Sequence, residues 1–202
     1  MKLYPDDMIY IARRFFFAEE NYMVALIEVD YQKMGFEELV WHAAYEENEN
    51  AQFELGNRYH KGINEASQDD GEAVRWWRKA ARQGHAAAEN SLGIALCIGC
   101  DGIEPNPQRG MKFIRAAARK GYASAQYNLG RAYFIGEKTG VKQDFRKARE
   151  WVEKAVAQNY KHAKRLLKKI TAFHDNAGKS KKSPQLPGHW ISVSQQDKCI
   201  AG

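Results

Sequence analysis

Apolar residues in the middle of the chain recur with the spacing of an α-helix. Ala88, Leu92 and Leu96 lie at i, i+4 and i+8, on one face of a helix with 3.6 residues per turn. The pattern predicts a first helix over about residues 86–98 and a second from 107 or 108 to 120. Glycines and prolines between them supply a helix end and a turn.

The same helix pair recurs along the chain at a nearly fixed interval. Related phrases begin at Leu55-Gly56, Leu92-Gly93 and Leu129-Gly130, and both steps are 37 residues. An alanine-rich phrase that ends in glycine keeps the same step. One extra residue in the third unit falls near 138–141, in a loop, where an insertion leaves the packed faces unchanged. A period of this size indicates a helical solenoid.

Small residues in the predicted helices indicate where helices approach closely. Gly56, Gly93 and Gly130 lie inside first helices, where glycine costs about 0.5–1 kcal/mol relative to alanine, so we expect two backbones to meet there. The second-helix residues expected at the same contact are Ala80, Ala117 and Ala155. The large residues expected to fill the space between units are Trp76, Phe113 and Trp151.

The flanks of the repeats predict three regions. Residues 1–49 are expected to form a degenerate N-terminal capping repeat, since a terminal unit has only one neighbour. Residues 50–170 hold three repeats and a terminal helix, and 171–202 are predicted to be a flexible or partner-docking tail. Within that tail, apolar and polar residues alternate over 189–194, as in a β-strand. The alternatives for this segment are that it folds back on the solenoid, docks on a partner as a strand or stays mobile.

These residues resemble the Sel1-like repeats, relatives of the tetratricopeptide repeats. The family pattern Ala-x-Ala-x-x-x-Leu-Gly-x-x-Tyr-x-x-Gly is matched in full from Ala123 to Gly136, and Ala148-x-x-Trp151-x-x-Lys154-Ala155 completes the unit. The resemblance implies an all-α, right-handed α-solenoid of Sel1-like helix-turn-helix repeats. About seven or eight helices are expected.

The middle unit departs from the family pattern at three positions. It has Leu96 for tyrosine, Gly110 for alanine and Phe113 for tryptophan. We therefore expect looser packing in this unit. The resemblance covers residues 50–170 well and 6–49 weakly.

Each first helix carries a stripe of non-consensus residues opposite its packing face. The positions follow i, i+4 and i+7, and stacking would align them on the concave side of the solenoid. Their aromatic and polar composition is typical of interface cores, although Phe53 and Tyr127 could instead pack between repeats. The candidate partner-binding residues are Phe53, Asn57, His60, Asn90, Ile94, Cys97, Tyr127, Arg131 and Phe134.

Motifs for chemistry are weak throughout the chain. Cys97 and Cys100 form a C-x-x-C, but zinc needs two further ligands and the sequence has no second pair. No phosphate-binding glycine loop or nucleophile elbow appears, and the six histidines have no metal-binding spacing. We expect no metal, no cofactor and no enzymatic activity.

Charge is distributed unevenly in the 202-residue chain, whose net charge is +6. Residues 1–50 carry 4 Lys and Arg against 11 Asp and Glu, and the remainder carries 27 against 14. The two ends would attract different partners or are simply solvated. The basic run 161–169 could attract phosphates, but no aromatic residues are interleaved in it, so nucleic acid is the less favoured partner.

The sequence favours a non-catalytic scaffold or adaptor that binds another protein. An immunity-type inhibitor of a cognate bacterial toxin is an alternative use of the same fold. Nucleic-acid binding through the basic C-terminal half is the alternative from a different class. A sparse, odd set of three cysteines and the absence of a signal-peptide or membrane-span pattern favour cytoplasmic residence. The resemblance to the Sel1-like family implies a bacterial adaptor or regulator.

Overall fold

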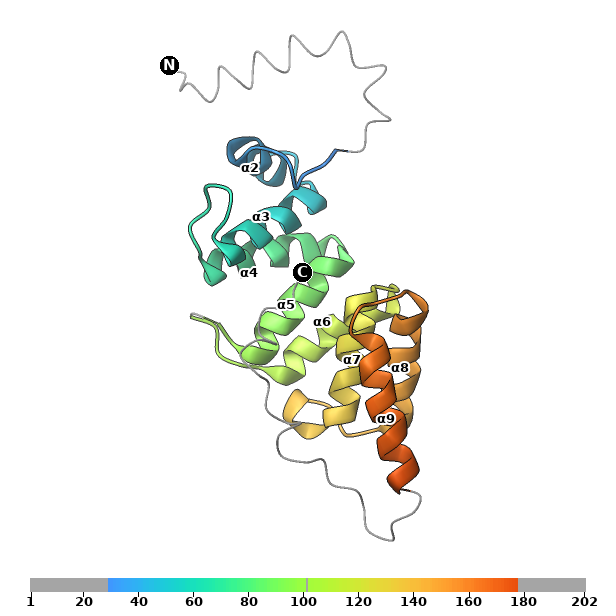
Figure 1. Ribbon diagram of the computed structural model, residues 1–202. Coiled ribbons are helices and arrows are strands. Elements are labelled where there is room, and N and C mark those ends of the chain that lie inside the picture. The colour runs from blue at the N-terminus through green and yellow to red at the C-terminus, as the bar shows by residue number, and fades with distance from the viewer. Residues whose placement is uncertain (1–28, 101, 178–202) are drawn as a thin grey trace, which may run out of the picture. The chain divides into compact units, whose positions relative to one another are not determined.

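The computed structural model describes residues 29–100 and 102–177 (Figure 1). The chain divides into two units, residues 1–33 and 34–202. In the first, 29–33 are described and form a turn in which Lys33 Nζ lies 2.9 Å from the Asp30 carboxylate. The expectations for 1–28 and for the strand-like segment 189–194 lie outside the described residues.

The described part of the second unit consists of helices that form an α-solenoid, which confirms the all-α prediction. Its eight α-helices are α2 (Phe36–Ala44), α3 (Glu49–Lys61), α4 (Asp70–Arg82), α5 (Ala86–Ile98), α6 (Pro107–Arg119), α7 (Ala123–Ile135), α8 (Phe145–Ala157) and α9 (Ala163–Ala177). A short 3₁₀ helix, η2 (Glu137–Thr139), occupies the loop where the extra residue was expected. The predicted pair over 86–98 and 107–120 corresponds to α5 and α6.

Consecutive helices pack on one another through the whole stack. Within repeats α3 packs on α4, α5 on α6 and α7 on α8, and between repeats α4 packs on α5, α6 on α7 and α8 on α9 (Figure 1). Three apolar clusters lie mainly between a second helix and the next first helix. The core is therefore a succession of small contacts along the chain, as expected of a repeat protein.

The second helices begin with the same cap. Asp69, Asn106 and Asp144 each accept a hydrogen bond from the backbone N–H three residues later, at 2.9 Å. The backbone N–H of each cap residue donates to a carbonyl near the end of the preceding helix, on Tyr59, Leu96 and Tyr133. These two bonds fix the helix-turn-helix geometry even though the third loop is one residue longer.

The mid-helix glycines lie where two helix backbones meet, as predicted. A Cβ on Gly56, Gly93 or Gly130 would lie 2.5–2.6 Å from a side chain of the second helix. The partners differ from those expected, because the contact lies three and seven residues before Ala80, Ala117 and Ala155. The residues actually in contact are Trp77 and Ala73, Ile114 and Gly110, and Val152 and Ala148.

The middle repeat is not loosely packed at Gly110, contrary to the expectation. A Cβ there would lie 2.4 Å from the Gly93 carbonyl oxygen and 2.9 Å from the Cys97 backbone nitrogen. Two glycines face each other across the α5–α6 crossing, so the backbones leave no space for the alanine that the family pattern has at this place.

Side-chain hydrogen bonds from the end of each second helix join each repeat to the residues before it. Gln83 donates to the Glu47 carbonyl (2.7 Å) and to Gln52 (3.0 Å), and Gln158 donates likewise to Gly121 (2.8 Å) and Gln126 (2.9 Å). At the middle boundary Lys120 donates to the Gly84 carbonyl (2.8 Å) and to Glu89 (2.7 Å). The same three positions are used each time, and equivalent positions lie 37 or 38 residues apart.

The helix before the first repeat has the geometry of a second helix. α2 packs on α3, and Glu47 follows it with a φ of 54°, where the other repeats end in Gly84 and Gly121 at 94° and 93°. Ala43 is fully buried at the position equivalent to Ala80. The described residues therefore include a helix equivalent to a second helix before the first repeat, and the capping repeat proposed for 1–49 stays a prediction.

The terminal helix extends beyond the predicted boundary at 170. α9 continues to Ala177, because Leu166, Ile170 and Phe173 keep helical spacing and pack against α7 and α8. Residues 171–177 thus belong to the helix, and the proposed tail begins later.

Candidate protein-binding face

The non-consensus residues of the first helices lie beside the buried packing face, and several of them contact the second helix of their own repeat. Leu55, Leu92 and Leu129 are buried at the packing face of α3, α5 and α7. α5 also contacts α7, and α7 contacts α9, so the first helices lie side by side. We call the solvent side of α3, α5, α7 and the start of α9 the first-helix face.

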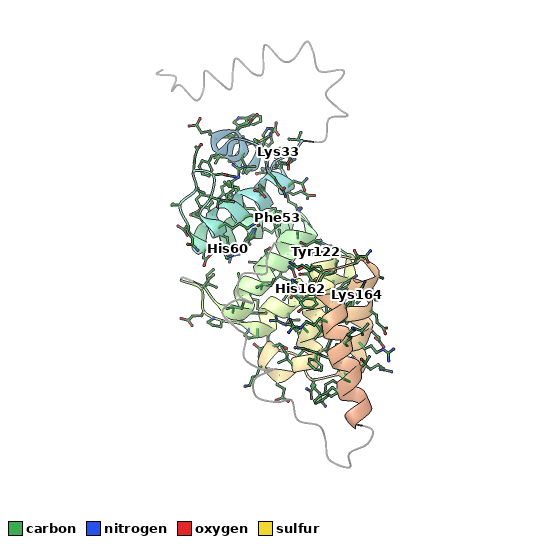
Figure 2. All side chains as sticks on the ribbon, viewed as in Figure 1. Lys33, Phe53, His60, Tyr122, His162 and Lys164 are labelled. Atoms are coloured by element: carbon green, nitrogen blue, oxygen red, sulfur yellow. The ribbon has the colours of Figure 1, made fainter. Side chains whose placement is uncertain are left out.

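In the first repeat, the predicted residues make defined contacts and remain half-buried. The Phe53 ring lies 4.7 Å from the ring of His85, centroid to centroid. Figure 2 labels Phe53 and His60 among the side chains of this repeat. Asn57 Oδ1 accepts from Trp77 Nε1 at 3.1 Å. His60 Nδ1 lies 2.6 Å from an Asp70 carboxylate oxygen, and its ring lies 5.3 Å from that of Trp77.

In the middle repeat, the predicted residues are buried or pack against the core. Asn90 is 2% exposed and accepts from Asn128 Nδ2 at 3.1 Å. Ile94 and Cys97 pack against the core between α6 and α7. Burial raises the pKa of the Cys97 thiol to about 11, and the positive charge of Arg131 opposes this rise. The thiol is therefore protonated at neutral pH and is a poor nucleophile.

In the third repeat, two of the predicted residues are partly exposed and the third is buried. Tyr127 stacks on Tyr160 at 5.2 Å and half-exposed Arg131 follows it one turn later. Phe134, however, is 4% exposed and packs against Phe145 and Phe173 at centroid distances of 5.8 and 5.9 Å.

Two of the nine predicted residues are therefore in the interior. Asn90 is covered because Asn128 of the next first helix reaches over to bond it, and Phe134 because α9 closes over α7. The other seven are partly exposed on the first-helix face: Phe53, Asn57, His60, Ile94, Cys97, Tyr127 and Arg131. Phe53 and Tyr127 also stack on His85 and Tyr160, the last residues of their repeats, and their partner-binding role stays a prediction.

The repeats themselves match a known family. The model of the Sel1 repeat matches residues 50–85, 86–122 and 123–160. The chain belongs to the Sel1 repeat family. No functionally curated protein was found to match it.

Two solved Sel1-type structures are similar to this chain. A Sel1 repeat protein from Oxalobacter formigenes is 37% identical, with a TM-score of 0.57, over 66% of this chain and 96% of that one. A protective antigen of uropathogenic Escherichia coli strains, which displays an SLR fold, is 34% identical, with a TM-score of 0.55; the match covers 62% of this chain and 26% of the antigen.

Sequence reasoning missed an aromatic cluster at the junction of α7 and α9. Tyr127, Tyr160 and His162 lie within ring-contact distance of one another, and Tyr160 lies 3.3 Å from Ser124, hydroxyl to hydroxyl. Tyr122 lies at the preceding repeat boundary and is 36% exposed (Figure 2). The available signal was positional: His85, Tyr122 and Tyr160 each directly follow a residue with positive φ after a second helix, at equivalent places in the three repeats.

The described residues offer little for metal chemistry or membrane insertion. Within 29–100 and 102–177, no group of three or more His, Cys, Asp or Glu side chains is arranged to hold a metal ion. No helix in the same ranges is long and apolar enough to span a lipid bilayer.

Proposed function

We propose that this Sel1 repeat protein is a non-catalytic scaffold that binds another protein through its first-helix face. Sel1 solenoids are typically protein-interaction scaffolds, and the Sel1 consensus residues here are used for packing. The specificity therefore resides in the non-consensus positions, which differ between repeats: Phe53, Asn90 and Tyr127 are equivalent, as are Asn57, Ile94 and Arg131.

The observation that supports the proposal best is the composition at and around α7, from its N-cap residue Tyr122 to His162 just before α9. Tyr122 is 36% exposed, and Tyr127, Arg131 and His162 are half-exposed. Tyrosine and arginine are the residue types most often found at binding hot spots, because they offer large contact area together with hydrogen bonds. A partner that covers Tyr122 and the neighbouring first-helix face would exclude water from these side chains.

The test is affinity capture with the full chain and two variants of matched composition. Tyr122→Ala/Arg131→Ala removes a tyrosine and an arginine from the first-helix face. Tyr45→Ala/Arg146→Ala removes the same residue types from exposed positions just after α2 and on α8. We expect a protein that the wild type and the Tyr45/Arg146 variant both retain, and that the Tyr122/Arg131 variant loses. Equal retention by all three would contradict the assignment of this face.

The immunity-type role is a narrower form of the same proposal. It requires that the captured partner have a toxic activity and that binding silence it. A reconstituted assay of the purified partner with increasing amounts of this chain separates the two roles. Inhibition that the Tyr122/Arg131 variant fails to produce supports an inhibitor, and an unaffected partner supports an adaptor.

A further inference from the structure

The outward side of two second helices carries a row of cations that the third lacks. α4 has Arg75, Arg78 and Arg82, and at the equivalent positions α6 has Lys112, Arg115 and Arg119. At the same positions α8 has Glu150, Glu153 and Ala157. We call the six residues of α4 and α6, together with Arg109, the cationic face. Because helix length and packing repeat while charge does not, packing does not dictate these charges.

The cations of this face are not neutralised by neighbouring carboxylates as those of α8 are. On α8, Glu150 lies 3.9 Å from Arg146 and Glu153 lies 2.7 Å from Arg149. On α4, only Arg75 has an ion pair within the helix, with Glu72. Among the described residues, no salt bridge reaches the rest of the cationic face, which is Arg78, Arg82, Arg109, Lys112, Arg115 and Arg119.

α6 bears its cations against its own helical stability. Arg109, Lys112, Arg115 and Arg119 follow one another three or four residues apart, and the helix has no acidic residue. Like charges at this spacing repel. Arg109 also lies in the first turn, where the helix dipole disfavours a positive charge. Helix stability accounts for Arg119, which lies in the last turn, but not for Arg109, Lys112 and Arg115. A negatively charged partner would offset both the repulsion between these cations and the unfavourable dipole interaction of Arg109.

We propose that the cationic face binds an acidic polypeptide segment, with Asp and Glu carboxylates lying along α4 and α6. All of its cations except Lys112 are arginines, whose planar guanidinium matches a carboxylate with paired hydrogen bonds. This surface is separate from the first-helix face, because it is formed by second helices.

The aromatic residues nearby favour a peptide over single-stranded nucleic acid. The Lys79 ammonium lies 4.0 Å above the Trp76 ring and covers it, and Phe113 packs against the core between α4 and α5. Binding of single strands relies on open aromatic rings on which bases stack. At this face the rings are occupied, so charge and guanidinium geometry provide the recognition.

The test uses fluorescein-labelled poly-glutamate peptide and full-length protein at physiological ionic strength, where charges separated by more than about 8 Å are largely screened. The face variant is Lys112→Gln/Arg115→Gln/Arg119→Gln. The matched control is Lys164→Gln/Arg165→Gln/Lys168→Gln, which removes the same charge from exposed positions of α9. Fluorescence anisotropy measures binding, and poly-glutamine of equal length controls for non-electrostatic binding.

We expect the face variant to bind poly-glutamate about tenfold more weakly, because three exposed ion pairs each contribute a few-fold. The α9 control should bind within about twofold of wild type. A gain-of-function variant, Glu150→Lys/Glu153→Arg, extends the face onto α8 and should tighten binding. Equal weakening by the face and control variants would overturn the proposal, since net charge alone would then explain binding. Stronger competition by oligothymidylate than by unlabelled poly-glutamate would assign the face to nucleic acid instead.

Discussion

The Lys120 ammonium lies 2.7 Å from a carboxylate oxygen of Glu89, and this ion pair stands where both neighbouring repeat boundaries have a pair of glutamines. The replacement is incomplete in one respect. Gln52 and Gln126 also donate from their side-chain amides to the carbonyls of Ala43 and Ala118. A carboxylate has no such donor, and the second oxygen of Glu89 is buried without a hydrogen-bond partner.

We predict that Glu89→Gln/Lys120→Gln together is at least as stable as wild type, because it restores the glutamine pair and adds a donor toward the carbonyl. Lys120→Gln alone should destabilise by about 1–3 kcal/mol, since it leaves a buried carboxylate without its cation. Urea unfolding of the wild type, Glu89→Gln, Lys120→Gln and the double variant gives the coupling free energy between the two residues directly. Additive effects of the two substitutions would mean that the residues do not act as a pair.

Gly110→Ala should destabilise the protein although alanine is the residue of the other two repeats at this place. The added Cβ would lie 2.4 Å from the Gly93 carbonyl oxygen, and this atom belongs to the backbone of α5. The expected cost is about 1–3 kcal/mol, larger than the gain of about 1 kcal/mol in helix propensity. Gly71→Ala is the control, because its Cβ would meet only the Asp69 side chain at 3.2 Å, and it should be neutral or stabilising. Thermal unfolding separates the two.

His85 should make the stability of the stack depend on pH. Its Nδ1 accepts a hydrogen bond from the Ala88 backbone N–H at 3.1 Å, which only an unprotonated nitrogen can do. Burial lowers the pKa of His85 below its usual 6.5; Glu49 opposes this shift and Lys120 adds to it. The unfolded chain therefore binds the proton more readily, so stability is retained above about pH 6.5 and falls as pH decreases below it.

His85→Asn tests this, because asparagine is a good N-cap at every pH and does not titrate. The variant should lose the stacking of Phe53 on His85 but should unfold with less dependence on pH between 5 and 8. The expected difference between wild type and variant across this range is about 1 kcal/mol, the size of one capping bond. His162→Asn, which leaves the α5 cap intact, should keep the dependence due to His85. A wild type as stable at pH 5 as at pH 8 would contradict the prediction.

The repeat spacing was sufficient to predict the helices of the solenoid, because each unit needs the same apolar side and the same turn. The range predicted for α5 agrees with the structure to the residue, and the glycine contacts lie on the predicted helices. Gly110 shows where the pattern misleads: departure from the family was taken as loss of packing, yet it reflects a closer approach of two backbones. The family consensus reflects the usual distance between the two helices of a repeat. The distance in one particular repeat can be shorter, as it is between α5 and α6.

The first-helix face was harder to predict, because exposure depends on the next repeat. Asn90 and Phe134 have the same helical register as exposed residues, but Asn128 and α9 cover them. Tyr122 was missed for the converse reason: it lies at a cap position, which a helical stripe does not include. Charge balance in the chain did indicate a basic region, but the overall balance did not point to the cations that recur at equivalent positions of α4 and α6, and their lack of ion pairs comes from the structure.

Arg58 should be the residue that holds the capping helix to the first repeat. Its side chain is fully buried, at a position that is Ala95 and Ala132 in the later repeats. Nη2 donates to the Met34 carbonyl at 2.6 Å, just before α2, and Nε lies 3.6 Å from Glu54.

Arg58→Ala should therefore destabilise the protein by about 3–5 kcal/mol, since it leaves a cavity and an unpaired Glu54. Hydrogen exchange should show the largest loss of protection in α2, because the segment before it loses its anchor. Arg58→Met keeps most of the side-chain volume and should cost less. If Arg58→Ala lowered protection equally from α2 to α9, the arginine would support the whole stack and not its first helix.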